Sequence, residues 1–295
     1  MTGAVVETDG LGKRYRRRWA LRDCALTLPA ARIIGLVGLN GAGKTTLLHL
    51  MVGLLDATTG SIAVFGERPG SRAELLARVG FVAQSSPVYP SLTVGEHLAF
   101  GRRMNLRWNE EGSRERLGDL GLDPGQRAGQ LSGGQRAQLA LTLALGKRPE
   151  LLILDEPVAS LDPLARREFL QILMAAVADQ EMTIVLSSHL LGDLERVCDH
   201  VVVLSAGRVQ LAGDVDDLLA EHHLLSGPRK DPARLPRDQR VVTAEHTDRQ
   251  STLLVHTTAP ILDPAWSVSD VSLEDLVLAY MAADRAANGK AAVPS

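Results

Sequence analysis

The chain has 295 residues, of which 45% are hydrophobic, and a formal net charge of -3 at pH 7. This length exceeds one average domain, so we expect one large domain with a buried core and something smaller beside it. The small negative charge excludes a global basic field that would attract nucleic acid or anionic lipid, and any such contact has to be local. Cys24 and Cys198 lie far apart in apolar surroundings, which favours free thiols in a reducing compartment over a disulfide.

Neither a secretion signal nor a membrane span is indicated. The N-terminus lacks the basic start and the apolar core of a signal peptide. Apolar runs stay well below the roughly 18 to 20 residues that cross a bilayer. We therefore expect a cytosolic chain, with any membrane span supplied by a partner.

Short strand-like runs at residues 4–7, 24–28 and 32–37 open the chain, and a charged turn at residues 13–19 separates the first two. We interpret this basic turn as a solvated hairpin in preference to a patch that attracts phosphates. Tyr15 lies within it. An aromatic ring beside basic residues is a place where a nucleobase can stack, whereas a lone tyrosine in a turn usually serves only packing, and the residues leave both readings open.

A glycine-rich loop comes next, matching the phosphate-cradling pattern G-x-x-x-x-G-K-[ST]. An apolar run at 33–37 predicts the strand before it, and residues 45–55 predict the helix after it. Backbone N–H groups of such a loop point at phosphate oxygens, the Lys44 ammonium reaches the terminal phosphates, and the Thr45 hydroxyl can ligate Mg²⁺. We expect the nucleotide to be bound by Gly38, Asn40, Gly41, Ala42, Gly43, Lys44, Thr45 and Thr46.

Beyond this loop, the pattern predicts a strand at 60–66, a helix at 72–79 and a buried strand at 79–83 that ends at Gln84. Ligands of doubly wound sheets lie at the carboxyl ends of the strands, so Gln84 is a candidate for the Mg²⁺ or water side of the phosphate site. An isolated glutamine is, however, more often an ordinary loop residue. Strand signals then vanish over residues 87–147, which predicts a helical insertion that includes a capping box at 93–96.

A second polar edge follows the insertion. An apolar strand at 151–154 ends in Asp155 and Glu156. Asp155 is the expected second Mg²⁺ ligand, and Glu156 can polarise a water molecule for attack on the terminal phosphate. The next buried strand ends at His189, where a lone histidine is more often structural than catalytic. A strand pair over residues 201–213 closes this part of the fold.

Taken together, these residues resemble the ATP-binding subunit of ABC transporters over roughly residues 4 to 225. The specific element is Leu131-Ser132-Gly133-Gly134-Gln135, which is similar to the ABC signature and separates this family from other P-loop ATPases. The resemblance implies a P-loop NTPase-type α/β fold. Its parts are a parallel sheet core, an N-terminal antiparallel β subdomain, the helical insertion and a small C-terminal α+β appendage.

The resemblance also implies individual roles. Tyr15 corresponds to the aromatic residue that stacks on adenine, Gln84 to the Q-loop glutamine, and His189 to the switch histidine that contacts the γ-phosphate. The catalytic set is then Glu156, His189, Lys44 and Gln84, with Thr45, Gln84 and Asp155 toward Mg²⁺. Residues from the signature and the D-loop complete the ATP site: Ser132, Gly133, Gly134, Gln135 and Asp162.

In the family, two ATP-binding domains pair head to tail, and the signature of one caps the γ-phosphate held by the P-loop of the other. Donors at a helix N-terminus are suited to that task. The resemblance therefore implies a second ATP-binding subunit, with a homodimer expected. It also implies an integral membrane permease, and a place in the cytoplasm on the inner face of the cell membrane.

Residues 226–295 form the expected second unit. A proline-rich, charged segment at 228–236 has the composition of a linker, two alternating runs at 239–258 predict a strand pair, and residues 272–283 predict a capped helix before a frayed tail. Such an appendage is similar to the one in exporter-type, ABC-2-like subunits. The domains are then 1–225 and 226–295.

Two classes of function fit the resemblance. The first is an energy-coupling ATPase that drives a separate membrane protein, with export expected. The second is a soluble ABC ATPase that acts on nucleic acid or the ribosome. The chain has one P-loop, one signature, no heptad insertion and no net basic charge, so we favour transport and expect no nucleic-acid partner.

Overall fold

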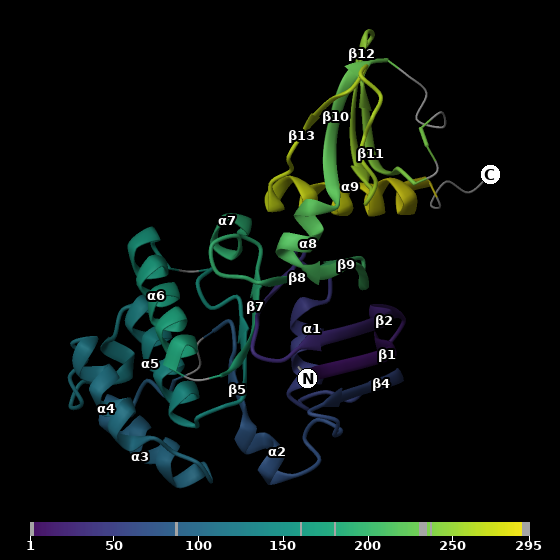
Figure 1. Cartoon of the computed structure of the whole chain (residues 1–295). Coiled ribbons are helices and arrows are strands. Elements are labelled where there is room, and N and C mark those ends of the chain that lie inside the picture. Colours follow the sequence, from purple (N-terminus) through teal and green to yellow (C-terminus); the bar gives the residue numbers. More distant parts are fainter. Residues whose placement is uncertain are drawn as a thin grey trace.

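The structure is a computed structural model that describes residues 3–85, 88–159, 161–179, 181–229, 235–236 and 238–290. Figure 1 shows a lower part, built from two sheets and a group of helices, and an upper part in which a small sheet stands on a long helix. The lower part holds the glycine-rich loop. The upper part is the C-terminal appendage.

The N-terminal sheet is antiparallel, in the order β2-β1-β4. Its strands are β1 (Ala4–Tyr15), β2 (Arg18–Pro29) and β4 (Thr59–Val64). Buried and exposed residues alternate along β1 and β2, because one face of this sheet packs on the core and the other faces water. Cys24 in β2 and Cys198 are buried free thiols, and burial raises the pKa of Cys198 to about 12. The expectation of unpaired cysteines is confirmed.

The central sheet has the strand order β5-β6-β7-β3-β8-β9 and is parallel except at the β9 edge. Its strands are β5 (Val79–Val82), β6 (Leu151–Asp155), β7 (Thr183–Ser188), β3 (Ile33–Val37), β8 (His200–Ser205) and β9 (Arg208–Asp214). Every residue of β3, β6 and β7 is buried, as the unbroken apolar runs predict. The parallel strands bring their carboxyl ends to one edge, where the expected site residues follow.

Helices cover this sheet and form the expected insertion (Figure 1). They are α1 (Lys44–Met51), α2 (Ala73–Arg78), α3 (Val94–Met104), α4 (Glu110–Asp119), α5 (Gly133–Gly146), α6 (Pro163–Asp179) and α7 (Leu191–Leu194), with a short 3₁₀ helix at Ala128–Gln130. The Thr93 capping box is present at the start of α3. The expected end of the helix after the P-loop was wrong: α1 stops at Met51, before Gly53 with its positive φ of 75°. Helix α5 begins at Gly133, where Ser132 and Gln135 cap it.

The C-terminal sheet has the order β11-β12-β10-β13 and is antiparallel throughout. Its elements are β10 (His222–Pro228), β11 (Arg240–His246), β12 (Gln250–His256) and β13 (Ser267–Ser269), with α8 (Val215–Ala220) before it and α9 (Leu273–Lys290) after it. The expected boundary between residues 225 and 226 falls inside β10, because His222 to Pro228 all pair with β12. The helix also runs to Lys290, past the expected end at 283. Most of the proline-rich segment lies outside the described residues.

Helix α9 joins the two parts of the molecule. It lies between the small sheet and the β8–β9 side of the central sheet (Figure 1), and it packs against β8, β9, α7 and α8. Leu276, Val277 and Met281 of α9 belong to the same buried cluster as Val201 and Val203 of β8. On the other face of the small sheet, a second cluster forms around Leu225, Leu253, Val255 and Trp266. The appendage therefore has a core of its own and also shares one with the central sheet.

Candidate active site

The phosphate loop joins β3 to α1 and is fixed by glycines that no other residue can replace without a clash. Gly43, with φ of 109°, is the N-cap of α1. A Cβ at Gly43 would lie 2.6 Å from the carbonyl oxygen of Ala20, and a Cβ at Gly38 would lie 2.4 Å from the carbonyl oxygen of Leu204. The loop is therefore wedged between β2 and the end of β8. This fixes where its N–H groups point.

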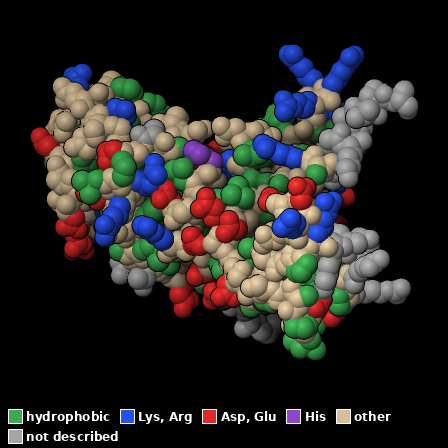
Figure 2. Space-filling view, turned by 90° about the horizontal axis from the view of Figure 1, so that it is seen from above, with side chains coloured by type: hydrophobic (Ala, Val, Ile, Leu, Met, Phe, Trp, Pro, Cys, Tyr) green, Lys and Arg blue, Asp and Glu red, His purple; other side chains and the backbone are tan. Residues whose placement is uncertain are grey.

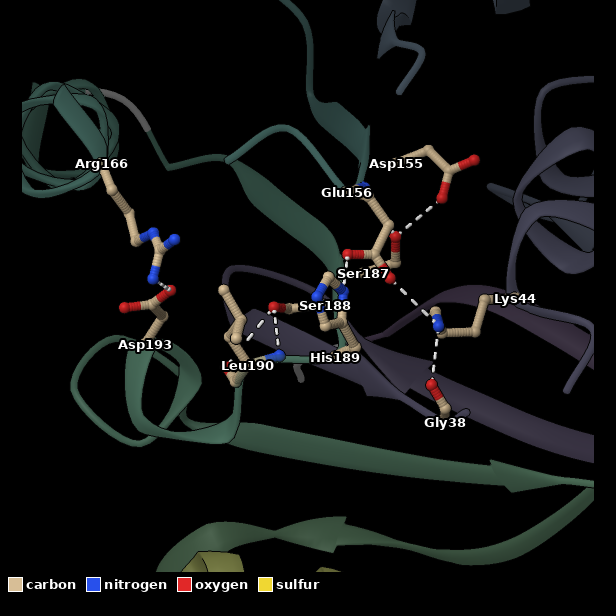
Figure 3. Close-up of polar contacts among 10 residues, drawn as sticks. All are labelled: Gly38, Lys44, Asp155, Glu156, Arg166, Ser187, Ser188, His189, Leu190 and Asp193. Carbon is tan, nitrogen blue, oxygen red and sulfur yellow. Dashed lines mark hydrogen bonds and ion pairs between the residues drawn. The ribbon is translucent and has the colours of Figure 1, made fainter. Parts of the chain in front are cut away.

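Lys44 is buried, with 6% of its surface exposed. Its ammonium donates a hydrogen bond to the carbonyl of Gly38 at 2.6 Å and pairs with Glu156 Oε1 at 3.0 Å (Figure 3). A buried charge requires such partners, because an uncompensated one is costly. Glu156 follows β6 and Lys44 begins the helix after β3, with β7 between these two strands. The parallel sheet brings both residues to its carboxyl end, as the sequence predicts.

Glu156 bridges two cationic or polar groups. Its Oε2 lies 2.7 Å from Nδ1 of His189, while Oε1 holds Lys44 (Figure 3). With Glu156 ionised, the carboxylate accepts and His189 Nδ1 carries the proton. Glu156 has a left-handed backbone with φ of 48°, an uncommon conformation for a residue other than glycine. The turn after β6 is thus built to aim this side chain at the edge of the sheet.

Ser187 holds the two adjacent acids in place, and the sequence reasoning missed it. Its hydroxyl donates to Asp155 Oδ1 at 2.8 Å and accepts from the backbone N–H of Glu156 at 2.8 Å. Ser187 is fully buried on β7, which runs beside β6. A polar residue at the carboxyl end of an apolar run, just before His189, was the available signal.

A cavity of about 540 Å³ lies at this edge, within the range of small-molecule sites. Of the predicted residues, it is lined by Tyr15, Asn40, Gly41, Gly43, Lys44, Thr45, Thr46, Gln84, Glu156 and His189. Gly38, Ala42 and Asp155 are not among its lining residues; Asp155 is buried against Ser187. The cavity thus brings together one aromatic ring, the phosphate loop, and the acid and histidine of the opposite strands.

Four further residues line the cavity that the sequence analysis did not assign to it: Arg18, Trp19, Ala20 and Leu39. Three of them begin β2, directly after a turn of only two residues, Arg16 and Arg17, which is shorter than the expected turn at 13–19. Arg16 and Arg17 at the turn are exposed, as expected of a solvated hairpin, but Arg18 belongs to the cavity wall. Figure 2 shows Lys and Arg side chains standing out at one corner of the face seen from above.

The signature and D-loop residues lie elsewhere. Ser132 caps α5 by accepting from the Gln135 N–H at 3.2 Å, and Gln135 Oε1 accepts from the Ser132 N–H at 2.9 Å. Asp162 caps α6 through the N–H groups of Leu164 and Ala165. Neither group lines the cavity of this chain, and Ser160 of the D-loop lies outside the described residues. The helix start that carries Gly133 and Gly134 is therefore available to something other than the P-loop of the same chain.

Comparison with known proteins decides the family. The model of the ABC transporter family matches residues 21–159. The uncharacterized ABC transporter ATP-binding protein YxlF of Bacillus subtilis is 35% identical over 72% of this chain and 72% of its own length. The chain belongs to the ABC transporter ATP-binding proteins.

Other members of the family differ in the transport they serve. The nickel import ATP-binding protein NikO of Rhodobacter capsulatus is 38% identical, over 76% of this chain and 94% of NikO. The Nod factor export ATP-binding protein I of Burkholderia lata is 33% identical over 84% of each chain. Among solved structures, cbiO1 from Clostridium perfringens, part of the ABC transporter complex cbiONQ, has a TM-score of 0.65 and 27% identity over 74% of this chain and 92% of cbiO1.

As a member of this family, the chain is an ABC ATPase that binds ATP and hydrolyses it in support of transport. The fold agrees with the P-loop NTPase type expected from the motifs. Within the described residues, no helix has both the length and the apolar character needed to cross a membrane.

The donor set at the edge suits Mg²⁺. Thr45, Gln84 and Asp155 offer hydroxyl, amide and carboxylate oxygens, the hard ligands that Mg²⁺ prefers together with substrate phosphates. The described residues contain no group of three or more His, Cys, Asp or Glu side chains that could hold a metal ion.

Proposed function

We propose that this chain is the energy-coupling ATPase subunit of an exporter, which binds ATP with Mg²⁺ in the cavity and drives a separate membrane permease. The observation that carries the proposal is the line of Lys44, Glu156 and His189 beside the phosphate loop. Lys44 is oriented by Gly38, and Glu156 by the turn after β6. A cation for phosphate, a base for water and a histidine next to that base are the parts of ATP hydrolysis.

Each of these side chains has a role in the reaction. When ATP binds, the Lys44 ammonium moves from Glu156 to the terminal phosphates, because both are anionic partners for this buried cation. Glu156 then accepts the proton of the water that attacks the γ-phosphorus, and ADP leaves. His189 holds the carboxylate at the correct angle through Nδ1 and presents its half-exposed ring to the γ-phosphate. Mg²⁺, when bound by Thr45, Gln84 and Asp155, neutralises charge on the phosphates.

The signature supports a pair of ATP-binding subunits, and we propose a homodimer. Ser132, Gly133 and Gly134 form a helix start outside this chain's own cavity. A helix N-terminus favours anions, so the natural ligand of this one is the γ-phosphate bound to a second copy. Gly134 leaves room there, since a Cβ would meet Ala165 at 3.3 Å, near the D-loop cap.

An apolar groove offers the place for the permease. It has a volume of about 380 Å³ and lies between β5, α3 and α5. Exposed aromatic and aliphatic side chains form its rim, including Phe100, Met104 and Tyr89, with exposed fractions of 46%, 67% and 58%. Grooves of this kind accept the apolar face of an amphipathic helix. Strand β5 lines the groove, and Gln84, two residues beyond its end, lines the ATP cavity, so one continuous segment connects the two sites.

Export is favoured because the alignment with one export protein covers more of this chain than the alignment with an importer does. The alignment with the Nod factor export protein covers 84% of this chain, more than residues 1–225 can supply, so it reaches the appendage. The alignment with the importer NikO covers 76%. We place the chain on the cytoplasmic face of the cell membrane, because ATP is there and the permease provides the span.

The test is co-purification of the full chain with a multi-span membrane protein from the cells that produce it. We expect the two to form a complex, and Phe100→Asp to separate them by placing a charge in the groove. Leu278→Asp is the matched control, because Leu278 on α9 is 49% exposed, close to the 46% of Phe100, but lies outside the groove. Retention of the complex by Phe100→Asp contradicts the groove. A wild-type chain that neither hydrolyses ATP nor binds a membrane protein contradicts the function.

A further inference from the structure

The β1–β2 hairpin places Arg18 directly opposite Tyr15. The two form the last pair of the ladder before the two-residue turn at Arg16 and Arg17. Directly opposite residues of an antiparallel pair point to the same face, with their Cβ atoms about 5 Å apart. Both line the ATP cavity. A cation therefore stands beside the ring that is expected to meet adenine.

Strand β2 then leads from Arg18 to the phosphate loop. Ala20, two residues on, lies so close to the loop that a Cβ on Gly43 would be 2.6 Å from its carbonyl oxygen. Two residues of a strand span about 6.6 Å, which is similar to the length of an arginine side chain. The side chain of Arg18 is therefore long enough to reach the stretch between the Tyr15 ring and the loop.

Three other cations on the two hairpin strands have partners within the chain. Lys13 donates to the carbonyl of Asp56 at 2.6 Å and lies 5.6 Å from the centre of the Tyr15 ring. Arg14 and Arg22 lie over Trp19, at 5.4 Å and 5.8 Å from its ring centre. Arg18 is exposed and forms no ion pair or hydrogen bond with any described side chain. Its five donors are free for a ligand in the cavity.

We propose that Arg18 binds the α-phosphate of the nucleotide. The inference rests on the proposed ATP site and adds a residue to it. Tyr15 marks the base end of the cavity, and Lys44 with the phosphate loop marks the end of the terminal phosphates. The α-phosphate is the anionic group between them. A guanidinium fits two phosphate oxygens at once, so Arg18 supplies a second fixed cation besides Lys44.

The experiment measures the affinity of the full chain for ATP, ADP and adenosine by calorimetry, in wild type, Arg18→Gln and Arg17→Gln. Arg17 is the matched control, because it is the neighbouring arginine at the tip of the turn and does not line the cavity. We expect Arg18→Gln to weaken the binding of ATP and of ADP by the same factor, about five- to twentyfold for the loss of one exposed charge-assisted contact. The affinity for adenosine should not change. Arg18→Lys retains part of the affinity. Arg17→Gln changes none of the three.

Other outcomes overturn the assignment in distinguishable ways. An equal loss for adenosine means that Arg18 stacks on the base. A loss confined to ATP means that it contacts the γ-phosphate. If Arg18→Gln and Arg17→Gln lose equal affinity for ATP and ADP, the positive charge of the whole hairpin attracts the nucleotide and Arg18 makes no specific contact. If Arg18→Gln loses no affinity, Arg18 does not contact the nucleotide. Failure of the wild-type chain to bind ATP contradicts the proposed function instead, whatever the variants do.

Discussion

The edge of the central sheet and the C-terminal appendage both bury polar side chains, but the two regions use them differently. At the sheet edge, Lys44, Glu156 and His189 form a line that opens on a cavity. In the appendage, His222 is fully buried, with Nδ1 2.6 Å from the carbonyl of Leu218 and Nε2 2.9 Å from the hydroxyl of Tyr280. The first arrangement leaves acceptors and donors for a ligand. The second closes its polar groups on one another and joins α8, β10 and α9.

The two sets of buried polar groups differ in what surrounds them. Those at the edge carry charge next to strained backbone and wedged glycines, which are features that cost stability and are kept for chemistry. Those in the appendage satisfy each other within a packed junction, which specifies how two units fit together. Changes at the edge should affect turnover with little effect on folding, and changes in the junction should do the reverse.

The largest effect is expected from Glu156→Gln, which removes the base while its shape stays. We expect turnover to fall at least about a hundredfold, the usual scale for a general base. ATP binding should persist, because the variant frees Lys44 from its ion pair. ATPase rates and gel filtration with ATP, which should show a stable dimer, provide the measurement.

Glu150→Gln is the control for that change. Glu150 precedes β6 as Glu156 follows it, and it pairs with Arg78 and Arg107 at 2.8 Å and 2.9 Å on the opposite edge of the sheet. The turnover of Glu150→Gln should stay within about twofold of wild type, because surface ion pairs contribute little to stability and Glu150 lies away from the cavity. If Glu150→Gln and Glu156→Gln reduce turnover alike, the sheet edge is not the catalytic one.

Leu276→Ala tests the junction. Leu276 is fully buried between α9 and the β8 side of the central sheet, so its truncation should cost about 2 to 5 kcal/mol of unfolding free energy. The ATP affinity of the folded protein should remain close to that of wild type. Thermal unfolding and calorimetry at a temperature where both proteins are folded provide the comparison.

Leu278→Ala is the matched variant on the same helix, because that side chain is 49% exposed and should cost little. Loss of ATP binding by folded Leu276→Ala would show that the appendage controls the ATP site through α9. The two regions would then be one functional unit, contrary to the comparison above.

The smallest effect concerns pH. Burial lowers the pKa of His222, an effect reinforced by the neighbouring His256 and His223 and opposed by the Leu218 carbonyl and Glu221. The folded state therefore binds a proton less readily than the unfolded state. The His222 contribution to stability is complete above its ordinary pKa of 6.5 and is lost progressively as pH falls below that value.

Hydrogen exchange in α9 and α8, measured at pH 8 and at pH 5.5, should show faster local opening at the lower pH. His222→Asn should weaken this pH dependence in α9. Burial also lowers the pKa of His200 at the start of β8, so exchange in β8 serves as the internal reference. An unchanged pH response of α9 in His222→Asn would assign the effect to another group.

Much of the site follows from sequence. The glycine pattern at 38–46, the apolar strands and the acids and histidine at their carboxyl ends were all predicted, and parallel pairing alone requires these ends to meet. The resemblance also pointed to the signature residues and implied that they act on the nucleotide of a second subunit, and they do not line the cavity of this chain. Ser187 and Arg18 were missed, since a serine in an apolar strand and an arginine in a basic turn look ordinary until their neighbours are known.

The sequence by itself determined the type of each main element, because hydrophobic periodicity, glycine turns and capping residues are local signals. Only the tertiary structure decided where the appendage begins, since β10 is defined by its pairing with β12, whose residues lie far along the chain. It also decided that α9 shares a core with β8 and that Arg18 enters the cavity wall. The physical reason is the same in each case: burial and strand pairing depend on contacts between distant segments, which no local pattern encodes.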